Sequence, residues 1–373
     1  MSTPSALRVL MLGPLGPPHV EAQVRALVER GVDVHVGGDF PPELDGVAPL
    51  EELGVPVSHA PRPARSSPHG IVLATLWARR LIRDVEPQLV HAHWVPGFGF
   101  AAAAAGASPL AVTAWGSDVY RASRVQDAAS RFTLRRAALV MADSEHLLER
   151  CGELGARGRA EVIQWGVDTD AFDVPSQARR GELRRALGWG DAPIVLSPRS
   201  LMPVYNIPVV VEAFRSLRAG RSDARLVLKH MGPVRVELGE LPAGAEIVGN
   251  VSYERMADFY RAADVCVSVT SSDSSPRSVW EAMACGCPCV LSDLPWVHEL
   301  LTPGREALLV PVGDAGALRA AVERILADPA LAAGLAKHGR ELVERHLSQR
   351  VQMDRLAALY REVIADGVQG RSP

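Results

Sequence analysis

The strongest constraint on the fold of this chain is a regular alternation of short apolar segments with amphipathic segments of helical period. Such alternation is typical of parallel α/β sheets, in which a helix connects each strand to the next. The strands expected in the first half are Arg8–Leu12, Val32–Val36, Leu89–His91, Leu110–Thr113, Leu139–Ala142 and Glu161–Gln164. The helices expected between them are Val20–Glu29, Gly70–Val85, Ala101–Ala105, Arg124–Arg136 and Glu145–Glu153.

The alternation stops between Val167 and Arg179, a segment without a clear period that we interpret as a linker, and then begins again. The strands expected after it are Ile194–Ser197, Arg225–Lys229, Glu246–Val248, Val265–Val269, Pro288–Leu291 and Ala307–Val310. The helices expected there are Pro208–Arg218, Tyr253–Ala262, Ser278–Ala284, Ala315–Leu326 and most of the segment from Pro329 to Val368. With 373 residues, the chain has the length of two domains.

Composition narrows the class of protein further. Hydrophobic residues make up 47% and charged residues 22%, which predicts a packed globular protein, and the net charge of −3 argues against broad nucleic-acid binding. The run Cys285-Gly-Cys-Pro-Cys289 is too tightly spaced for the usual zinc pair, so we expect buried thiols in a reducing compartment. No apolar stretch approaches the roughly 20 residues that span a bilayer. We therefore expect a cytoplasmic protein without a bound metal.

Ligands of doubly wound sheets bind at the carboxyl ends of strands, so the loops after strands are the candidate sites. The loop that begins at Gly13 follows the first expected strand, and its Gly16 would bring backbone N–H groups close to a phosphate or simply make a turn. His91 and His93 end another strand. We expect their rings to point to opposite faces, so that one reaches the ligand while the other is buried in the core.

Two further strand ends carry polar side chains. In Trp115-Gly-Ser-Asp118, the carboxylate of Asp118 would accept hydrogen bonds from sugar hydroxyls, and Trp115 would either stack on a sugar or fill the core. The longest such segment runs from Ser271 to Asp293. Its Ser278 and Glu281 fit a helix capping box, but a Ser- and Arg-rich loop at a helix N-terminus also suits a diphosphate.

The segment Asp273-x₇-Glu281-Ala-Met-Ala-x-Gly resembles the E-x₇-E-A-M-A-x-G signature of the retaining GT-B glycosyltransferases of family 4, also known as glycosyltransferase group 1. His91-Ala-His93, Gly166-Val-Asp168 and Arg199 at a strand end are similar to this family at corresponding places. The resemblance implies two doubly wound Rossmann-like domains that face a cleft, with a C-terminal helix crossing back to the first. The implied parts are an acceptor-binding domain (1–170), a nucleotide-sugar-binding domain (171–348) and that helix (349–373).

The resemblance also implies roles for individual residues. Catalytic roles fall to Arg199, Asp273, Glu281 and Asp118. Donor binding falls to Gly16, Tyr205, Asn206, Lys229, Ser274, Ser275, Arg277, Ser278 and Glu281. Acceptor binding falls to His19, His93, Trp94 and Trp115.

Three positions depart from the family pattern. Asp273 stands where most members have Glu, Val204 and Tyr205 stand where a Lys usually follows the Arg, and Trp115 replaces a His, as in a subset with W-G-S-D. These changes leave Arg199, backbone N–H groups, Tyr205, Asn206 or Lys229 to hold the diphosphate.

The function implied is a metal-independent hexosyltransferase (EC 2.4) that uses a UDP- or GDP-sugar as co-substrate, needs no cofactor and acts on an acceptor we do not identify: a small molecule, a natural product, or a lipid or polysaccharide precursor. The alternatives are a GT-B nucleotide-sugar epimerase and a non-catalytic nucleotide-sugar-binding protein. We expect a monomer or homodimer. The stretch from Arg62 to Arg83 is either a basic amphipathic helix for weak association with a membrane surface or a helix whose apolar side faces the core.

Overall fold

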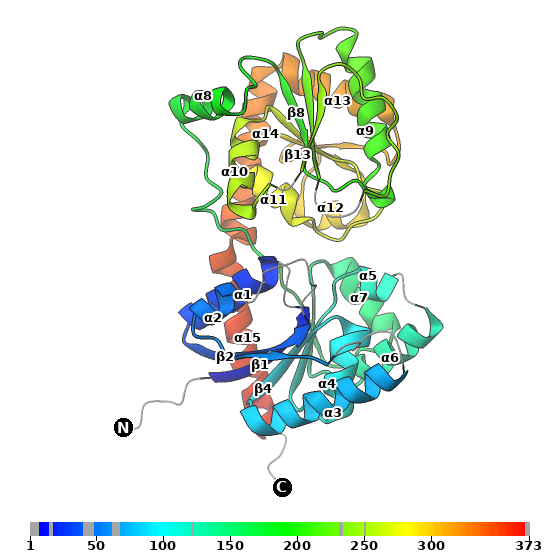
Figure 1. Ribbon diagram of the computed structural model, residues 1–373, viewed down its shortest axis with the longest axis vertical. Helices are drawn as coiled ribbons and strands as arrows, with labels where there is room; N and C mark the ends of the chain where they lie inside the picture. Colours follow the sequence, from blue (N-terminus) through cyan, green and yellow to red (C-terminus); the bar gives the residue numbers. More distant parts are fainter. Residues whose placement is uncertain are drawn as a thin grey trace. The chain divides into compact units, whose positions relative to one another are not determined.

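The structure is a computed structural model that describes residues 7–14, 18–39, 48–61, 68–120, 123–230, 234–249 and 251–369. The chain divides into two compact units (Figure 1). Unit 1 consists of residues 1–165 together with 350–373, and unit 2 consists of residues 166–349. The chain therefore leaves unit 1 after Trp165 and re-enters it at Arg350.

Unit 1 contains a seven-stranded sheet of order β3-β2-β1-β4-β5-β6-β7, in which each neighbouring pair is parallel. The strands are β1 (Leu7–Pro14), β2 (Val32–Asp39), β3 (Val57–His59), β4 (Leu89–His93), β5 (Leu110–Thr113), β6 (Leu139–Ala142) and β7 (Arg159–Val162). The strand order reverses between β1 and β4. In doubly wound sheets, ligands bind at the carboxyl ends of the strands beside such a reversal.

Helices cover both faces of this sheet. The helices α1 (Pro18–Glu29), α2 (Ala48–Glu52) and α15 (Gln349–Gln369) bury apolar side chains in one core. The other core is shared by α3 (Pro68–Val85), the π-helix η1 (Val95–Gly99), α4 (Phe100–Ala105), α5 (Ser117–Tyr120), α6 (Arg124–Leu134) and α7 (Glu145–Glu153). The strands β1, β5 and β6 contribute side chains to both cores and are apolar runs, whereas the buried valines of β2 all belong to one core and alternate with polar residues.

The helix α15 is an integral part of unit 1. Its Met353, Leu356 and Tyr360 are fully buried against the sheet. The Tyr360 hydroxyl lies 2.6 Å from His91 Nδ1, and Arg30, just after α1, forms a 2.7 Å ion pair with Asp354. The place where the chain changes units is closed by two backbone hydrogen bonds within unit 2, from Val167 N–H to the Leu347 carbonyl and from the Gln349 N–H to the Val167 carbonyl, each 2.8 Å long.

Unit 2 contains a six-stranded parallel sheet of order β10-β9-β8-β11-β12-β13. The strands are β8 (Ile194–Ser197), β9 (Arg225–His230), β10 (Ala245–Gly249), β11 (Val265–Ser268), β12 (Cys289–Ser292) and β13 (Ala307–Val310). Here the order reverses between β8 and β11, which makes the carboxyl ends of these two strands the corresponding candidate position for a ligand.

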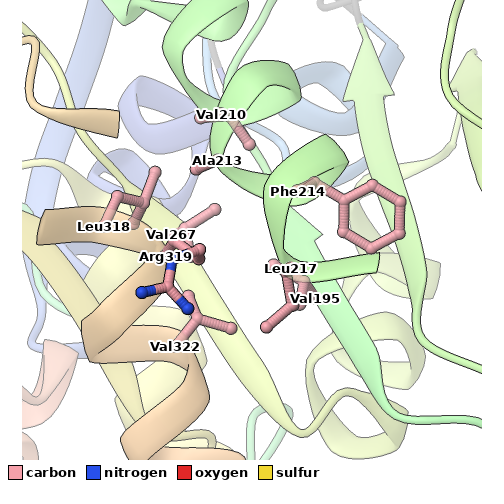
Figure 2. Close-up of a pocket in the computed structure, with 9 residues that line it drawn as sticks. All are labelled: Val195, Val210, Ala213, Phe214, Leu217, Val267, Leu318, Arg319 and Val322. Carbon is pink, nitrogen blue, oxygen red and sulfur yellow. The ribbon is translucent and has the colours of Figure 1, made fainter. Parts of the chain in front are cut away.

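Two helical layers enclose the second sheet. One contains α8 (Gln177–Ala186), α10 (Tyr253–Ala262), α11 (Arg277–Ala284), α12 (Pro295–Leu300) and η3 (Val343–Leu347), and the other contains α9 (Ile207–Arg218), α13 (Ala315–Ala327) and α14 (Pro329–Leu342). Figure 2 shows a small gap between α9, α13 and the strands, lined by Val195, Phe214, Leu318 and other side chains. Its volume is about 10 Å³, which is too small for a ligand, so it is a packing gap of the core.

The predicted fold class of two parallel α/β domains is confirmed, and the element boundaries need several corrections. The elements β3, α2, α5, α8 and α12 were not predicted, and α8 begins at Gln177, inside the predicted linker. The five cysteines are buried free thiols. Among the helices in the described ranges, none is both long and apolar enough to cross a bilayer.

In the helix α3, the apolar side chains do not all face the core, as one interpretation of the sequence had them. Ala74, Ala78 and Leu81 do face the core of unit 1. Val72 and Leu76, by contrast, are 58% and 55% exposed. Apolar side chains therefore lie on both the buried side and the outer side of this helix.

Candidate active site

The loops that follow β8 and β11 bring Arg199 and Asp273 together at the point where the strand order of unit 2 reverses. Arg199 Nη2 lies 2.7 Å from Asp273 Oδ2, and its Nη1 donates to Ser278 Oγ at 3.1 Å. The guanidinium carbon lies 4.2 Å from the centre of the Tyr205 ring. Only 11% of the Arg199 side chain and 16% of the Asp273 side chain are exposed. The cation is thus held in one orientation by a carboxylate, a hydroxyl and an aromatic face.

The same two loops are joined by further hydrogen bonds. The backbone N–H of Ser271 donates to the Val204 carbonyl at 2.8 Å, and the side-chain amide of Asn206 donates to the Val269 carbonyl at 3.0 Å. Asn206 has a left-handed backbone with φ of 49°, which its short polar side chain tolerates. Asn206 therefore holds the loops together, and Tyr205 orients Arg199.

Glu281 lies beside Arg199's loop in a buried polar network. It is 5% exposed, its Oε1 lies 3.1 Å from Arg277 Nε, and its Oε2 accepts from the Tyr260 hydroxyl at 3.4 Å. Burial raises the pKa of Glu281, although Arg277 and Lys229 oppose this change. Lys229, at the end of β9, is also buried, and burial lowers its pKa while Glu281 raises it. Three charged groups thus share a nearly dry environment.

The predicted capping box at Ser278 is wrong. The helix α11 begins at Arg277 with Pro276 as its N-cap residue, and its N-cap makes no side-chain hydrogen bond. Ser278 lies inside the first turn, where its hydroxyl accepts from Arg199 instead. Ser274 and Ser275 precede the helix, and Ser275 Oγ accepts a 2.9 Å hydrogen bond from Trp280. This loop is fixed by internal contacts rather than by a cap.

In unit 1, the expectation that His91 and His93 point to opposite faces is wrong. Residues two apart on a strand share a face, and the two ring centres lie 4.3 Å apart. His91 is fully buried between Thr113 Oγ1 at 2.7 Å and the Tyr360 hydroxyl at 2.6 Å. Burial lowers its pKa well below the usual range, so His91 is a neutral core residue.

His93 has a different environment. Its Nδ1 accepts a 3.3 Å hydrogen bond from Trp115 Nε1, so the hydrogen of the neutral ring lies on Nε2. Burial lowers the pKa of His93 to about 3. The buried Nε2 makes no hydrogen bond, and an unsatisfied buried donor costs about 1–3 kcal/mol. The ring fits only because Gly13 has no side chain: a Cβ there would lie 3.0 Å from His93 Cβ.

His93 belongs to a group of aromatic rings at the carboxyl ends of β1, β4, β5 and β7, which we name the aromatic cluster: His19, His93, Trp94, Trp115 and Trp165. The His19 ring lies 4.2 Å from that of Trp165 and 5.0 Å from that of Trp115, and His93 stacks on Trp165 at 5.5 Å. The tryptophan side chains are half-buried. Sequence reasoning missed Trp165, although its place just after a strand was a usable signal.

The backbone at Trp94 is strained, with φ of 70° and ψ of 91°, which is rare for a bulky residue. The π-helix η1 follows directly, and the Trp94 carbonyl accepts from the N–H groups of both Gly97 and Gly99. Strained backbone and π-helical turns cluster at functional sites. The cost of this strain is therefore consistent with a ligand-binding role for the loop.

Asp118 was expected to accept hydrogen bonds from sugar hydroxyls, but in the structure it binds backbone groups. It is 2% exposed, and its two oxygens accept 2.9 Å hydrogen bonds from the backbone N–H groups of Val95 and Trp115. Burial raises its pKa to about 6, and these hydrogen bonds lower it. Asp118 therefore connects the two loops that carry Trp94 and Trp115. Gly16 lies outside the described residues.

Other cavities lie at the opposite ends of the strands. One of about 480 Å³ in unit 1 is bordered by Gln88 and Pro109, and one of about 580 Å³ in unit 2 is bordered by Asp264 and Pro288. These residues precede strands, whereas ligands of such sheets bind after them. Within the described ranges, no group of three or more His, Cys, Asp or Glu side chains is placed to hold a metal ion.

Comparisons with known proteins agree with the division of the chain into two units. Residues 17–166 match the family described as Glycosyl transferase 4-like domain, and residues 179–342 match Glycosyl transferases group 1. Alpha-D-kanosaminyltransferase of Streptomyces kanamyceticus is 27% identical over 63% of this chain, which spans 63% of that enzyme's length. The lipopolysaccharide core biosynthesis glycosyltransferase LpsE of Rhizobium meliloti is 25% identical over 89% of this chain and 91% of its own.

Solved structures show the same fold. Sucrose-phosphate synthase of Thermosynechococcus elongatus has a TM-score of 0.81 at 21% identity, covering 96% of this chain and 100% of its own. HepE of Anabaena, solved in complex with UDP and glucose, has a TM-score of 0.78 at 18% identity, covering 95% and 100%. The chain thus has the GT-B fold with a glycosyl transferase 4-like domain and a glycosyl transferases group 1 domain, and it is a member of the glycosyltransferases.

Proposed function

We propose that this protein is a retaining hexosyltransferase of family 4, of the subset with W-G-S-D, that transfers a sugar from a UDP- or GDP-sugar to an acceptor hydroxyl. The observation that carries the proposal is the placement of Arg199, Ser278 and the first turn of α11 at the point of strand reversal in unit 2. A guanidinium beside a helix N-terminus suits a diphosphate. The complexes of HepE with UDP support a nucleotide-sugar donor.

Catalysis in this proposal rests on charge. As the bond between the sugar and the diphosphate breaks, negative charge grows on the leaving oxygen, and Arg199 stabilises it without having to reorganise. The acceptor oxygen attacks the same face of the sugar that the diphosphate leaves, so the configuration is retained and no protein nucleophile is needed. The acceptor proton passes to the departing diphosphate. Asp273 would lie against the sugar, and Glu281 would hold the ribose.

Acceptor binding is assigned to unit 1. The half-buried tryptophan faces of the aromatic cluster suit the C–H face of a sugar or cyclitol ring, and the unsatisfied Nε2–H of His93 suits a hydroxyl or carbonyl oxygen of that ring. In this proposal, residues 1–170 bind the acceptor, 171–348 bind the donor, and 349–373 complete the first domain.

The proposal extends to the setting of the reaction. We place the protein in the cytoplasm as a monomer or homodimer that needs no metal, with weak association with membrane surfaces. One rival has specific support: a protein that binds a nucleotide sugar without turnover, because Asp273 already neutralises Arg199 at 2.7 Å and no Lys stands at Val204 or Tyr205.

The test is the release of nucleoside diphosphate from UDP-glucose, GDP-mannose and related donors, with and without a panel of sugar and cyclitol acceptors. A transferase releases diphosphate faster when its acceptor is present. An epimerase converts the donor without releasing diphosphate, and a binding protein converts neither the donor nor the acceptor. Arg199→Ala should lower donor affinity and turnover together. Arg324→Ala, which removes an exposed arginine of α13, is the matched control. Unchanged kinetics of Arg199→Ala would overturn the proposal.

A further inference from the structure

The outer side of α3 carries an apolar surface that is exposed among the residues of unit 1 that the structure describes. Ile71, Val72, Leu73 and Leu76, which we name the α3 patch, are 38%, 58%, 49% and 55% exposed. They lie within two turns of one helix, on the outside of unit 1 (Figure 1). Single exposed apolar residues are ordinary, but four in a contiguous group indicate a surface that binds something.

The α3 patch is not needed to hold the helix in place. The opposite side of α3 is already anchored in the core through Ala74, Ala78 and Leu81. A polar outer side would therefore be compatible with the same fold. The exposed apolar side chains consequently call for an explanation outside the core of unit 1.

Positive charge follows the patch along the same helix. Arg79, Arg80 and Arg83 are exposed. Asp84 lies 3.4 Å from Arg80 and 3.0 Å from Arg83, so one carboxylate is shared by two guanidinium groups, and Arg79 adds a third positive charge to the helix. The chain as a whole has a net charge of −3, so the surplus is local to this helix.

We propose that α3 is a docking surface for a bilayer that contains anionic lipid, with the α3 patch inserted at the level of the head groups and the arginines bound to lipid phosphates. Apolar residues beside exposed arginines on one helix are what such a surface recognises. A second copy of this chain fits less well, because two copies of α3 would bring like charges together. The inference gives the weak membrane association proposed above a site and a lipid class, and it does not depend on glycosyl transfer.

The experiment is flotation of the whole protein with vesicles of phosphatidylcholine alone and of equimolar phosphatidylcholine and phosphatidylglycerol, at low and high salt. We expect binding to the anionic vesicles that weakens with salt. Val72→Glu should lower the partition coefficient at least tenfold, and Arg79→Gln should lower it about fivefold. Val234→Glu in unit 2 is the matched control, because that valine is 59% exposed, and it should bind as the unaltered protein does.

Several outcomes would overturn the proposal. These are no flotation of the unaltered protein, equal losses for Val72→Glu and Val234→Glu, or equal binding to both kinds of vesicle. Light scattering tests whether the α3 patch is instead an interface between two copies of the chain. A dimer that Val72→Glu dissociates would support that interface and overturn the proposal. Melting curves confirm that each variant is folded. Binding of UDP and GDP without vesicles, measured on the same samples, shows separately whether the proposed donor site holds.

Discussion

Replacing Asp273 by Asn should strengthen the binding of a nucleoside diphosphate to unit 2. In the structure the Asp273 carboxylate lies 2.7 Å from Arg199 and neutralises the cation that would meet the diphosphate. A bound diphosphate must share Arg199 with this carboxylate and lie near its negative charge. Asparagine keeps the size of the side chain and an oxygen that can accept from the Ser274 N–H, now at 3.1 Å, but removes the charge.

The size of the effect follows from the geometry. Two like charges about 4 Å apart repel by about 4 kcal/mol at the effective dielectric constant of a protein surface. Asp273 is 16% exposed, so solvent screens part of this repulsion. The Asp273 carboxylate also holds Arg199 in its orientation, and the asparagine variant loses this favourable contribution. We therefore expect a net gain of roughly 1–2 kcal/mol, which is about a 5- to 30-fold lower Kd.

Titration calorimetry with UDP and with GDP, without any sugar, measures this gain. The decisive control is a double-mutant cycle with Arg199→Ala, which by itself should weaken binding. Repulsion between the Asp273 carboxylate and the diphosphate does not require Arg199, so the gain should persist when Asp273→Asn is combined with Arg199→Ala, reduced by the share that comes from freeing Arg199. No gain in either background, or weaker binding of Asp273→Asn, refutes the reasoning.

Three further predictions follow from the structure of the site and its supports. Burial raises the pKa of Asp118 to about 6, so between about pH 4 and 6 the native state keeps a proton that the unfolded state releases, and the unaltered protein should lose about 3 kcal/mol of stability over this range. Asp118→Ala removes this carboxylate and its two backbone hydrogen bonds, so melting curves of the variant should lack this loss. Tyr360→Phe should cost about 1–3 kcal/mol in denaturant unfolding because His91 Nδ1 loses its partner, whereas Tyr120→Phe at the surface should cost less, and equal costs would count against a special role for this contact. Transfer activity should survive EDTA because Arg199 supplies the positive charge, and a loss that Mg²⁺ reverses would contradict this.

The parts of the fold that could be predicted were those with a strong local signal. The strands β6 and β8 were predicted to the residue, because a strand buried on both faces is a continuous apolar run. The strand β3 was missed because it has only three residues, two of which are polar, and all three are at least partly exposed. The start of α8 was missed because its sequence has almost no apolar period and only Leu183 is buried.

The candidate site shows the same division. The loop motifs led to Arg199 and Asp273, but not to the ion pair between them, which joins residues 74 apart in the chain. The role of Asp118 depends on backbone groups of a loop 23 residues away, which a local motif does not contain. The prediction for His91 and His93 was wrong because side chains alternate between the two faces of a strand, so that residues two apart lie on the same face. Their different roles come from Tyr360, which lies 269 residues beyond His91.

The division of unit 1 by unit 2 has a consequence for synthesis. The ribosome releases the strands β1–β7 before the whole of unit 2, and α15 follows only after residue 349. Until then the core that α15 shares with the sheet, α1 and α2 lacks the side chains of Met353, Leu356 and Tyr360, so this core of the nascent first unit is incomplete. Unit 2 is continuous in sequence and can complete its core first. The first unit to be translated is therefore the second to complete its core.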